Sequence, residues 1–182
     1  MKKKTNYRWL YKIVLISIAA SMVFTLASAK ILGRAGYIVA FVTLAAFVII
    51  GIVFDIIGVA VTAAKEAPFH SMATHRERGA ADALRLIRNA DKTASFCSDV
   101  VGDVSGIVSG SMAALIAARL MEGVRAENIL VPLLISGAVT GIMIGGKAVG
   151  KTFAFNKSTA ILLAVGKLIN ILHLPKTDKR GQ

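Results

Sequence analysis

The sequence TASFCSDVVGDVSGIVSGSMAALIAARLM, residues 93–121, decides the fold. It is long and apolar enough to cross a bilayer, yet it contains Asp99 and Asp103 four residues apart. Residues four apart share one face of an α-helix, so both carboxylates are predicted on the same side. Small residues with the same spacing follow the helix: Gly102, Gly106 and Gly110. Such a face allows another helix to pack closely.

The two acids make this stretch a poor membrane helix on its own. About ten apolar residues favour insertion by roughly 3 to 6 kcal/mol, whereas each central Asp opposes it by roughly 2.5 to 3.5 kcal/mol. The helix therefore needs partner helices. An ionisable residue kept inside a span also indicates a functional site.

The composition is that of a membrane protein. Of the 182 residues, 55% are hydrophobic, and they arrive in runs of about twenty, the length that crosses a bilayer core of roughly 30 Å. The net charge of +12 would suit a nucleic acid. The basic residues lie between the apolar runs, however, without an aromatic platform, so no nucleic-acid partner is expected.

The chain is predicted to form a single transmembrane domain, residues 1–182, with an all-α, polytopic helix-bundle fold. The expected spans are residues 13–32, 37–64, 94–121 and 129–152, after a basic leader at 1–12. Juxtamembrane helices are expected at 65–92 and 156–174. The first run has a second interpretation as a signal peptide, because Ala27-Ser28-Ala29 matches a cleavage pattern. It continues apolar to Leu32, which favours a retained span.

Two sequence patterns predict how the helices pack. An i, i+3, i+4, i+7 stripe indicates a surface or interfacial helix: Ala80, Ala83, Leu84 and Ile87. The fourth run has its own glycine ladder: Gly137, Gly141 and Gly145. Two consecutive runs with such ladders suggest close packing of helices in lipid.

The distribution of Lys and Arg predicts the orientation. The leader, residues 65–92 and the part from Lys147 onward contain 18 of these residues, and the two intervening turns contain 4. The positive-inside rule therefore places both termini in the cytoplasm of a multi-pass inner-membrane protein.

The candidate site is built from acids at matching depth. Asp55 lies roughly 14 Å and Asp103 roughly 15 Å from the cytoplasmic ends of their spans, at 1.5 Å per residue. Carboxylate and hydroxyl oxygens suit Mg²⁺, Ca²⁺ or Mn²⁺. One hypothesis is thus a divalent-cation site of Asp55, Asp99 and Asp103, assisted by Ser98 or Ser105. The alternative is an intramembrane ion pair in which Lys147 holds Asp99 or Asp103.

A phosphate-loop pattern, G-x-x-x-x-G-K-[ST], is present at residues 145–152. That loop requires a preceding buried strand and an α/β sheet, whereas here it follows a membrane-length apolar run. No nucleotide is therefore expected. No Ser-His-Asp or Cys-His constellation is present either, so the chain is not expected to be an enzyme.

Three blocks between residues 54 and 174 carry a further pattern. They are Phe54 with Ala60-Val61-Thr62, then Arg76-Glu77-Arg78-Gly79-Ala80-Ala81 with Leu84-Arg85-Leu86-Ile87 and Asn89-Ala90-Asp91, and finally Gly146-Lys147-Ala148-Val149-Gly150-Lys151. Their order and spacing resemble the transmembrane domain of the cyclin-M (CNNM)/CorB–CorC magnesium transporters, with its F-x-S-x-S-E-T-A-L-T, E-G-N-x-x-A, L-x-N-P-[DE] and G-E-x-x-P-K blocks. The resemblance implies a homodimer whose spans hold a dehydrated Mg²⁺ that is open to the cytoplasm in one state.

The departures from this family fall on the chemistry. The family's S-x-S-E becomes Asp55-Ile56-Ile57-Gly58, and its G-N-x-x-x-N region falls near residues 100–105, where Asp99 and Asp103 supply oxygens. Its G-E becomes Gly146-Lys147, a reversal of charge. The regulatory CBS pair of the family has no counterpart in these 182 residues. The sequence thus predicts a Mg²⁺-like transporter or exchanger, with a non-transporting membrane scaffold or partner subunit as the alternative.

Overall fold

The fold is all-α, as predicted from the sequence. The computed structural model describes residues 7–34, 36–122 and 130–172, and within these ranges every element is a helix. The leader residues 1–6, the turn at 123–129 and the tail from 173 onward lie outside the described residues. Four helices are long and apolar enough to cross a membrane: Tyr11–Lys30, Tyr37–Ala63, Ala90–Met121 and Leu130–Leu172. The chain therefore has the architecture of a membrane protein.

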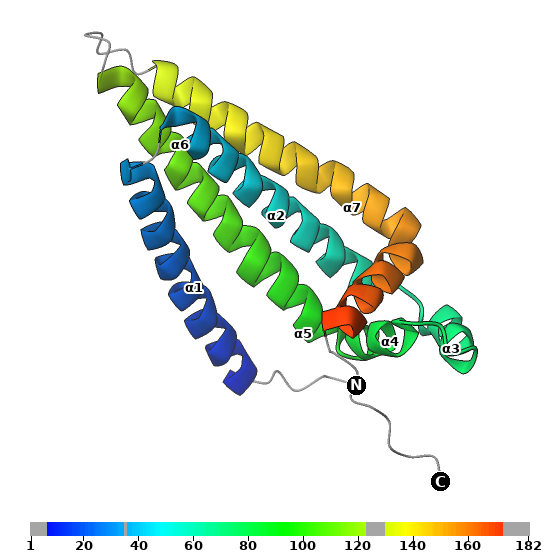
Figure 1. Ribbon diagram of the computed structural model, residues 1–182. Helices are drawn as coiled ribbons and strands as arrows, with labels where there is room; N and C mark the ends of the chain where they lie inside the picture. Colours follow the sequence, from blue (N-terminus) through cyan, green and yellow to red (C-terminus); the bar gives the residue numbers. More distant parts are fainter. Residues whose placement is uncertain (1–6, 35, 123–129, 173–182) are drawn as a thin grey trace.

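Three long helices form the centre of the bundle (Figure 1). Helix α2 (Tyr37–Ala63) lies between α6 (Val104–Glu122) and α7 (Leu130–Leu172) and packs against both. Its 27 residues include a single charge, Asp55, and its extended neighbours Gly36 and Ala64 end the helix on either side. Helix α1 (Tyr7–Arg34) lies at the side, mainly against α6, and most of its apolar side chains are exposed. An edge-to-face contact between Phe24 and Phe47, 5.7 Å between ring centroids, joins α1 to α2.

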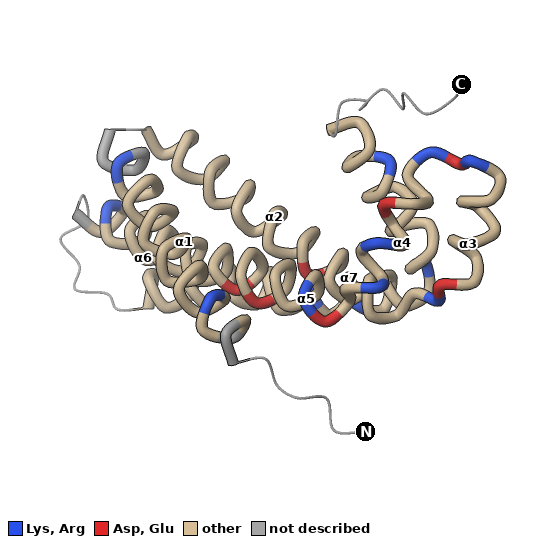
Figure 2. Tube along the Cα trace, turned by 90° about the horizontal axis from the view of Figure 1, so that it is seen from below, with Lys and Arg blue, Asp and Glu red and all other residues tan. Residues whose placement is uncertain are grey.

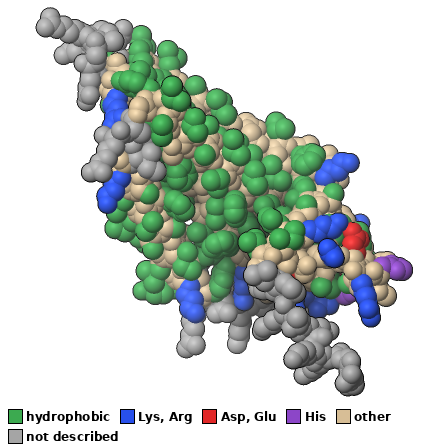
Figure 3. Space-filling view, in the orientation of Figure 1, with side chains coloured by type: hydrophobic (Ala, Val, Ile, Leu, Met, Phe, Trp, Pro, Cys, Tyr) green, Lys and Arg blue, Asp and Glu red, His purple; other side chains and the backbone are tan. Residues whose placement is uncertain are grey.

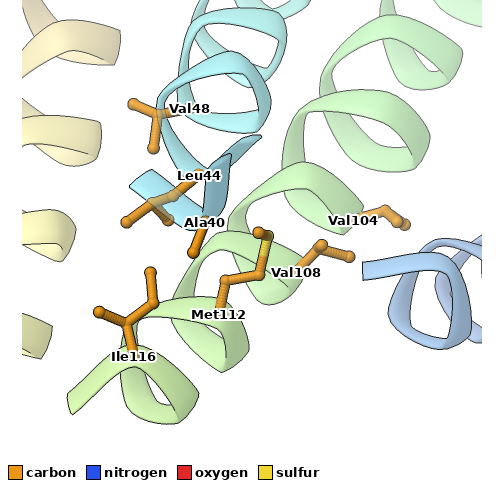
Figure 4. Packing of buried hydrophobic residues seen from close by; sticks show 7 residues of the cluster. All are labelled: Ala40, Leu44, Val48, Val104, Val108, Met112 and Ile116. Carbon is orange, nitrogen blue, oxygen red and sulfur yellow. The ribbon is translucent and has the colours of Figure 1, made fainter. Parts of the chain in front are cut away.

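Two apolar clusters hold the bundle together. The first lies along α2 and α6 (Figure 4), and its buried members are Ala40, Leu44, Val48, Val104, Val108, Met112 and Ile116. The second lies at the other end of α2, where it packs against the short helices α3 (Glu66–Thr74) and α4 (Ala80–Arg88). Its buried members are Ala60, Val61, Phe69, Ala83, Ile87, Ala154 and Leu162. Of the predicted stripe of α4, Ala80, Ala83 and Ile87 are buried, and Leu84 is partly buried against this cluster.

The surface of the bundle is mostly apolar along its length. Figure 3 shows hydrophobic side chains over most of the visible face. The acidic and histidine side chains visible in it lie at the end that carries α3 and α4, together with several basic ones, and other basic side chains lie at the opposite end and along the lower edge. Lipid is as apolar as these side chains, so the exposed Ile, Leu, Val and Phe of the spans suit a bilayer. We call the end of the bundle that carries α3 and α4 the α3/α4 end.

Two helices differ from the predicted boundaries. The third span begins earlier, with α5 (Ala90–Ser95), and continues through a π-helix, η1 (Phe96–Asp103), into α6. The fourth span and the following juxtamembrane helix, predicted separately at 129–152 and 156–174, are two helical segments of α7 that meet at a kink at Lys157 (φ −122°, ψ 22°), so the predicted division is present and the break lies inside the second predicted range. No glycine or proline marks this kink. We call residues 130–156 the proximal limb of α7 and residues 158–172 the distal limb.

The distal limb is fixed to α4 by a close backbone contact. Gly79 has a φ of +83°, and a Cβ at Gly79 or at Gly166 would overlap the backbone of the other segment. Only glycine allows both this conformation and this approach. Lys167 and Glu77 form an ion pair of 3.4 Å beside it. The distal limb thereby covers the α3/α4 end.

Candidate functional site

The candidate site lies where α2 meets η1 and the start of α6. Glycines allow a close approach along this contact: a Cβ on Gly51 would lie 3.1 Å from the Ser105 Cβ, and one on Gly58 would overlap the Ser98 hydroxyl. Between these two positions, a Cβ on Gly102 would lie 3.8 Å from the Asp55 Cβ. Asp55 therefore lies in the contact between α2 and η1, where the two helices approach each other closely.

Asp55 is buried in this contact. Its relative exposure is 5%, and its Oδ2 atom accepts no hydrogen bond from any residue that the structure describes. The nearest cation is the Lys151 ammonium on α7, with Nζ 3.8 Å from Oδ2. This distance balances the charge without making a hydrogen bond. A buried carboxylate oxygen with no donor is uncommon and indicates a functional role or an interaction with a mobile group.

Asp103 lies at the same level but points outward, with 66% of its side chain exposed. It pairs with Lys147 on α7, whose Nζ is 3.1 Å from Asp103 Oδ1 and donates a second hydrogen bond of 3.3 Å to the Gly102 carbonyl. The ion pair with Lys147, one of the two predicted alternatives, is therefore formed, and its partner is Asp103. Lys147 itself is only 19% exposed.

The other predicted ligands are distributed over two faces of η1 and α6. Ser98 lies against Gly58, and Ser105 is buried against Gly51, so both flank Asp55 on the α2 side. Asp99 is exposed. No group of three His, Cys, Asp or Glu side chains that could hold a metal ion occurs in the described part of the chain. The predicted ligands on η1 and α6 thus extend over about two turns, and together with Asp55 they do not converge on one point.

Lys151 was not among the site residues predicted from the sequence, yet its ammonium is paired with Asp55. Its position four residues after Lys147 places both ammonium groups on one face of α7. This spacing of two lysines, opposite two acids at matching depth, could have predicted that Lys151 pairs with an acid as Lys147 does. Figure 2 shows acidic and basic positions within the bundle as well as at its ends. Together, Asp55, Asp103, Lys147 and Lys151 form a four-charge cluster with no net charge, which joins α2 and η1 to the proximal limb.

The second glycine ladder does not pack as predicted. Cβ atoms on Gly137, Gly141 or Gly145 would meet nothing within 4 Å in this chain. Gly146 and Gly150 make the close contact instead, and a Cβ on Gly150 would lie 2.6 Å from Ile56 Cγ1. The side chains of Ile52 and Ile56 fill these positions, so the ladder faces away from α2.

A cavity of about 370 Å³ lies between α6 and the proximal limb, with Asp103 and Lys147 in its wall. Its other lining residues are mostly apolar or small: Gly106, Ile107, Gly110, Val139, Thr140, Met143 and Ile144. The segment that matches the phosphate-loop pattern, residues 145–152, is helical throughout. It forms no loop that could surround a phosphate.

A comparison of the chain with known protein families, with curated proteins and with solved structures gives no match.

Proposed function

We propose that this chain is a multi-pass membrane protein that transports or exchanges a divalent cation of the Mg²⁺ type. The observation that carries the proposal is Asp55, a carboxylate buried within a span whose Oδ2 atom accepts no hydrogen bond. Keeping such a group away from water is costly, and a passing cation would compensate for the cost. The cation would be cargo, held by oxygen atoms of Asp55 and of the η1 turn that carries Asp103.

The resemblance to the cyclin-M/CorB–CorC transmembrane domain supports the same proposal. It suggests a homodimer, and the distribution of Lys and Arg favours an inner-membrane protein with the α3/α4 end and both termini in the cytoplasm. The apolar surface of the bundle agrees with this setting (Figure 3). The six basic residues of the segment 65–92 agree with a cytoplasmic α3/α4 end.

The test is divalent-cation flux into liposomes that contain the purified full chain, followed with an enclosed fluorescent Mg²⁺ indicator. Asp55→Asn should abolish the flux because it removes the buried charge while it keeps the side-chain shape. Asp82→Asn is the matched control, since Asp82 pairs with Arg85 and Asn170 at the α3/α4 end. Flux that persists unchanged in Asp55→Asn would reject the proposal.

A second candidate function is a non-transporting scaffold or partner subunit with the same bundle. It is favoured by the two lysines, which already neutralise both acids. In that case the four-charge cluster would only connect three helices. Absence of flux and of any cation-dependent change in thermal unfolding with Mg²⁺, Mn²⁺ and Ca²⁺ would support the scaffold, because a ligand that binds the native state stabilises it.

A further inference from the structure

From the positions of Lys147 and Lys151, we infer that these two lysines are tethered cations which occupy the cation site and which the transported ion must displace. The inference rests on the proposed function, because it concerns the same site. It adds the residues that set the affinity of that site and its preference for a doubly charged ion.

The surroundings of the Lys147 ammonium are those of a hard cation. Its Nζ contacts a carboxylate oxygen of Asp103 and the backbone carbonyl of Gly102, at 3.1 and 3.3 Å. Carboxylate and carbonyl oxygens are the ligands that Mg²⁺ and Ca²⁺ take in proteins. An ammonium group is a compact charge that substitutes for such an ion more closely than a guanidinium does. The η1 turn therefore presents oxygens to a cation, and at present the cation is a lysine.

Lys151 contacts the buried Asp55 less closely than Lys147 contacts Asp103. Its Nζ lies 3.8 Å from Asp55 Oδ2, too far for a hydrogen bond, and the oxygen has no other donor in the described part of the chain. The Lys151 side chain is 52% exposed. A long, flexible stem allows its ammonium to move outward without a change in the helix. The buried oxygen is thus available to an ion once Lys151 withdraws.

Charge balance determines which ion can replace the lysines. Two carboxylates and two ammonium groups sum to zero in this apolar region. A divalent ion added to the intact cluster would leave two uncompensated positive charges, which a low dielectric strongly disfavours. If both ammonium groups withdraw, one divalent ion restores neutrality with the same two carboxylates. The exchange of two monovalent tethered cations for one divalent cation conserves the charge.

Both lysines can respond together because one helical segment carries them. They lie four residues apart on the proximal limb, before the kink at Lys157. Gly146 and Gly150 each directly precede one of these lysines in the sequence. They contact Ile52 and Ile56 of α2, respectively. A shift of the proximal limb away from α2 would move both ammonium groups away from their acids.

The experiment measures Mn²⁺ binding to the detergent-purified full chain by electron paramagnetic resonance. The double variant Lys147→Met/Lys151→Met should bind Mn²⁺ on the order of tenfold or more tightly than the natural chain, because two competing charges are removed. Addition of Asp55→Asn and Asp103→Asn to this variant should remove the gained binding. Lys167→Met, which breaks an ion pair at the α3/α4 end, is the control and should leave the affinity unchanged.

If the methionine variant does not fold, Lys147→Gln/Lys151→Gln removes the charges and keeps polar head groups. Equal Mn²⁺ affinity in the natural chain and in the charge-free variant would overturn the inference while leaving the transport proposal intact. Binding only in the charge-free variant, without flux in the natural chain, would support the inference and reject transport. If neither protein binds Mn²⁺, both proposals fail.

Discussion

The two lysine–carboxylate pairs of the cluster are opposites in burial. In the pair of Asp55 with Lys151 the acid is buried and the lysine is half exposed, whereas in the pair of Asp103 with Lys147 the lysine is nearly buried and the acid is exposed. The energy needed to break an ion pair is set by the charge that stays behind in the apolar region. The two pairs should therefore respond to opposite substitutions, although they are one helical turn apart on α7.

The largest expected effect is that of Lys151→Met. It leaves Asp55 buried without a counter-ion, and loss of one partner of a buried pair destabilises proteins by about 3 to 5 kcal/mol. Thermal unfolding of the detergent-purified chain should show a correspondingly lower midpoint. A change as small as that of Lys167→Met, at the α3/α4 end, would contradict the burial argument.

Asp103→Asn should have the next largest effect. It removes the negative charge opposite Lys147, which is 19% exposed, while the amide oxygen of Asn can still accept a hydrogen bond from the ammonium, as the Gly102 carbonyl does. A hydrogen bond to a charged group contributes about 1.5 to 3 kcal/mol, and the free energy of unfolding should fall by at most that amount. Chemical denaturation in mild detergent measures it. An effect larger than that of Lys151→Met would reverse the proposed difference between the pairs.

Gly150→Ala tests the helix contact that brings Lys151 toward Asp55. The new Cβ would lie 2.6 Å from Ile56 Cγ1, so the helices must move apart, and overpacking of this kind costs about 1 to 3 kcal/mol. Gly141→Ala on the open face of α7 is the matched control, and in monomeric micelles it should not lower the unfolding temperature. Equal effects of the two alanines would show that the two glycine faces are equivalent.

Lys147→Met should have the smallest effect of the four. The acid left behind is Asp103, which is 66% exposed and therefore less enclosed by the protein than Asp55. Its unfolding midpoint should lie close to that of the natural chain and well above that of Lys151→Met. Two lysine variants of equal stability would remove the distinction between the pairs.

The spans could be predicted from the sequence because run length and composition suffice for that purpose. The helical rise and antiparallel neighbours also predicted that Asp55 and Asp103 lie at similar depth, and the structure brings Gly102, which precedes Asp103, beside Asp55. The direction in which each side chain points could not be predicted, because it depends on rotation of each helix about its axis. For this reason, the pairing of Lys151 and the outward face of Gly137, Gly141 and Gly145 were missed.

The π-helix and the direction of the bend in α7 have a different cause. A π-helix differs from an α-helix in its i→i+5 hydrogen bonds and not in its composition, and η1 lies in contact with α2. The bend at Lys157 likewise lacks a helix-breaking residue, and it is tertiary packing of the distal limb on α4 that defines its direction. The local sequence therefore predicts the helices, whereas contacts between residues distant in sequence determine where the helices bend and how they connect.

The contact of Gly79 with Gly166 has a consequence for biogenesis. Residue 79 is synthesised long before residue 166, so α4 and the adjoining end of α2 remain uncovered until the last described helix has left the ribosome. Asp55 likewise enters the membrane before Lys151 exists, and α2 must be apolar enough to insert with its acid unpaired. The order of synthesis thus makes α7 the closing element of assembly: a chain truncated before the kink would insert its spans and still lack the cover of its α3/α4 end.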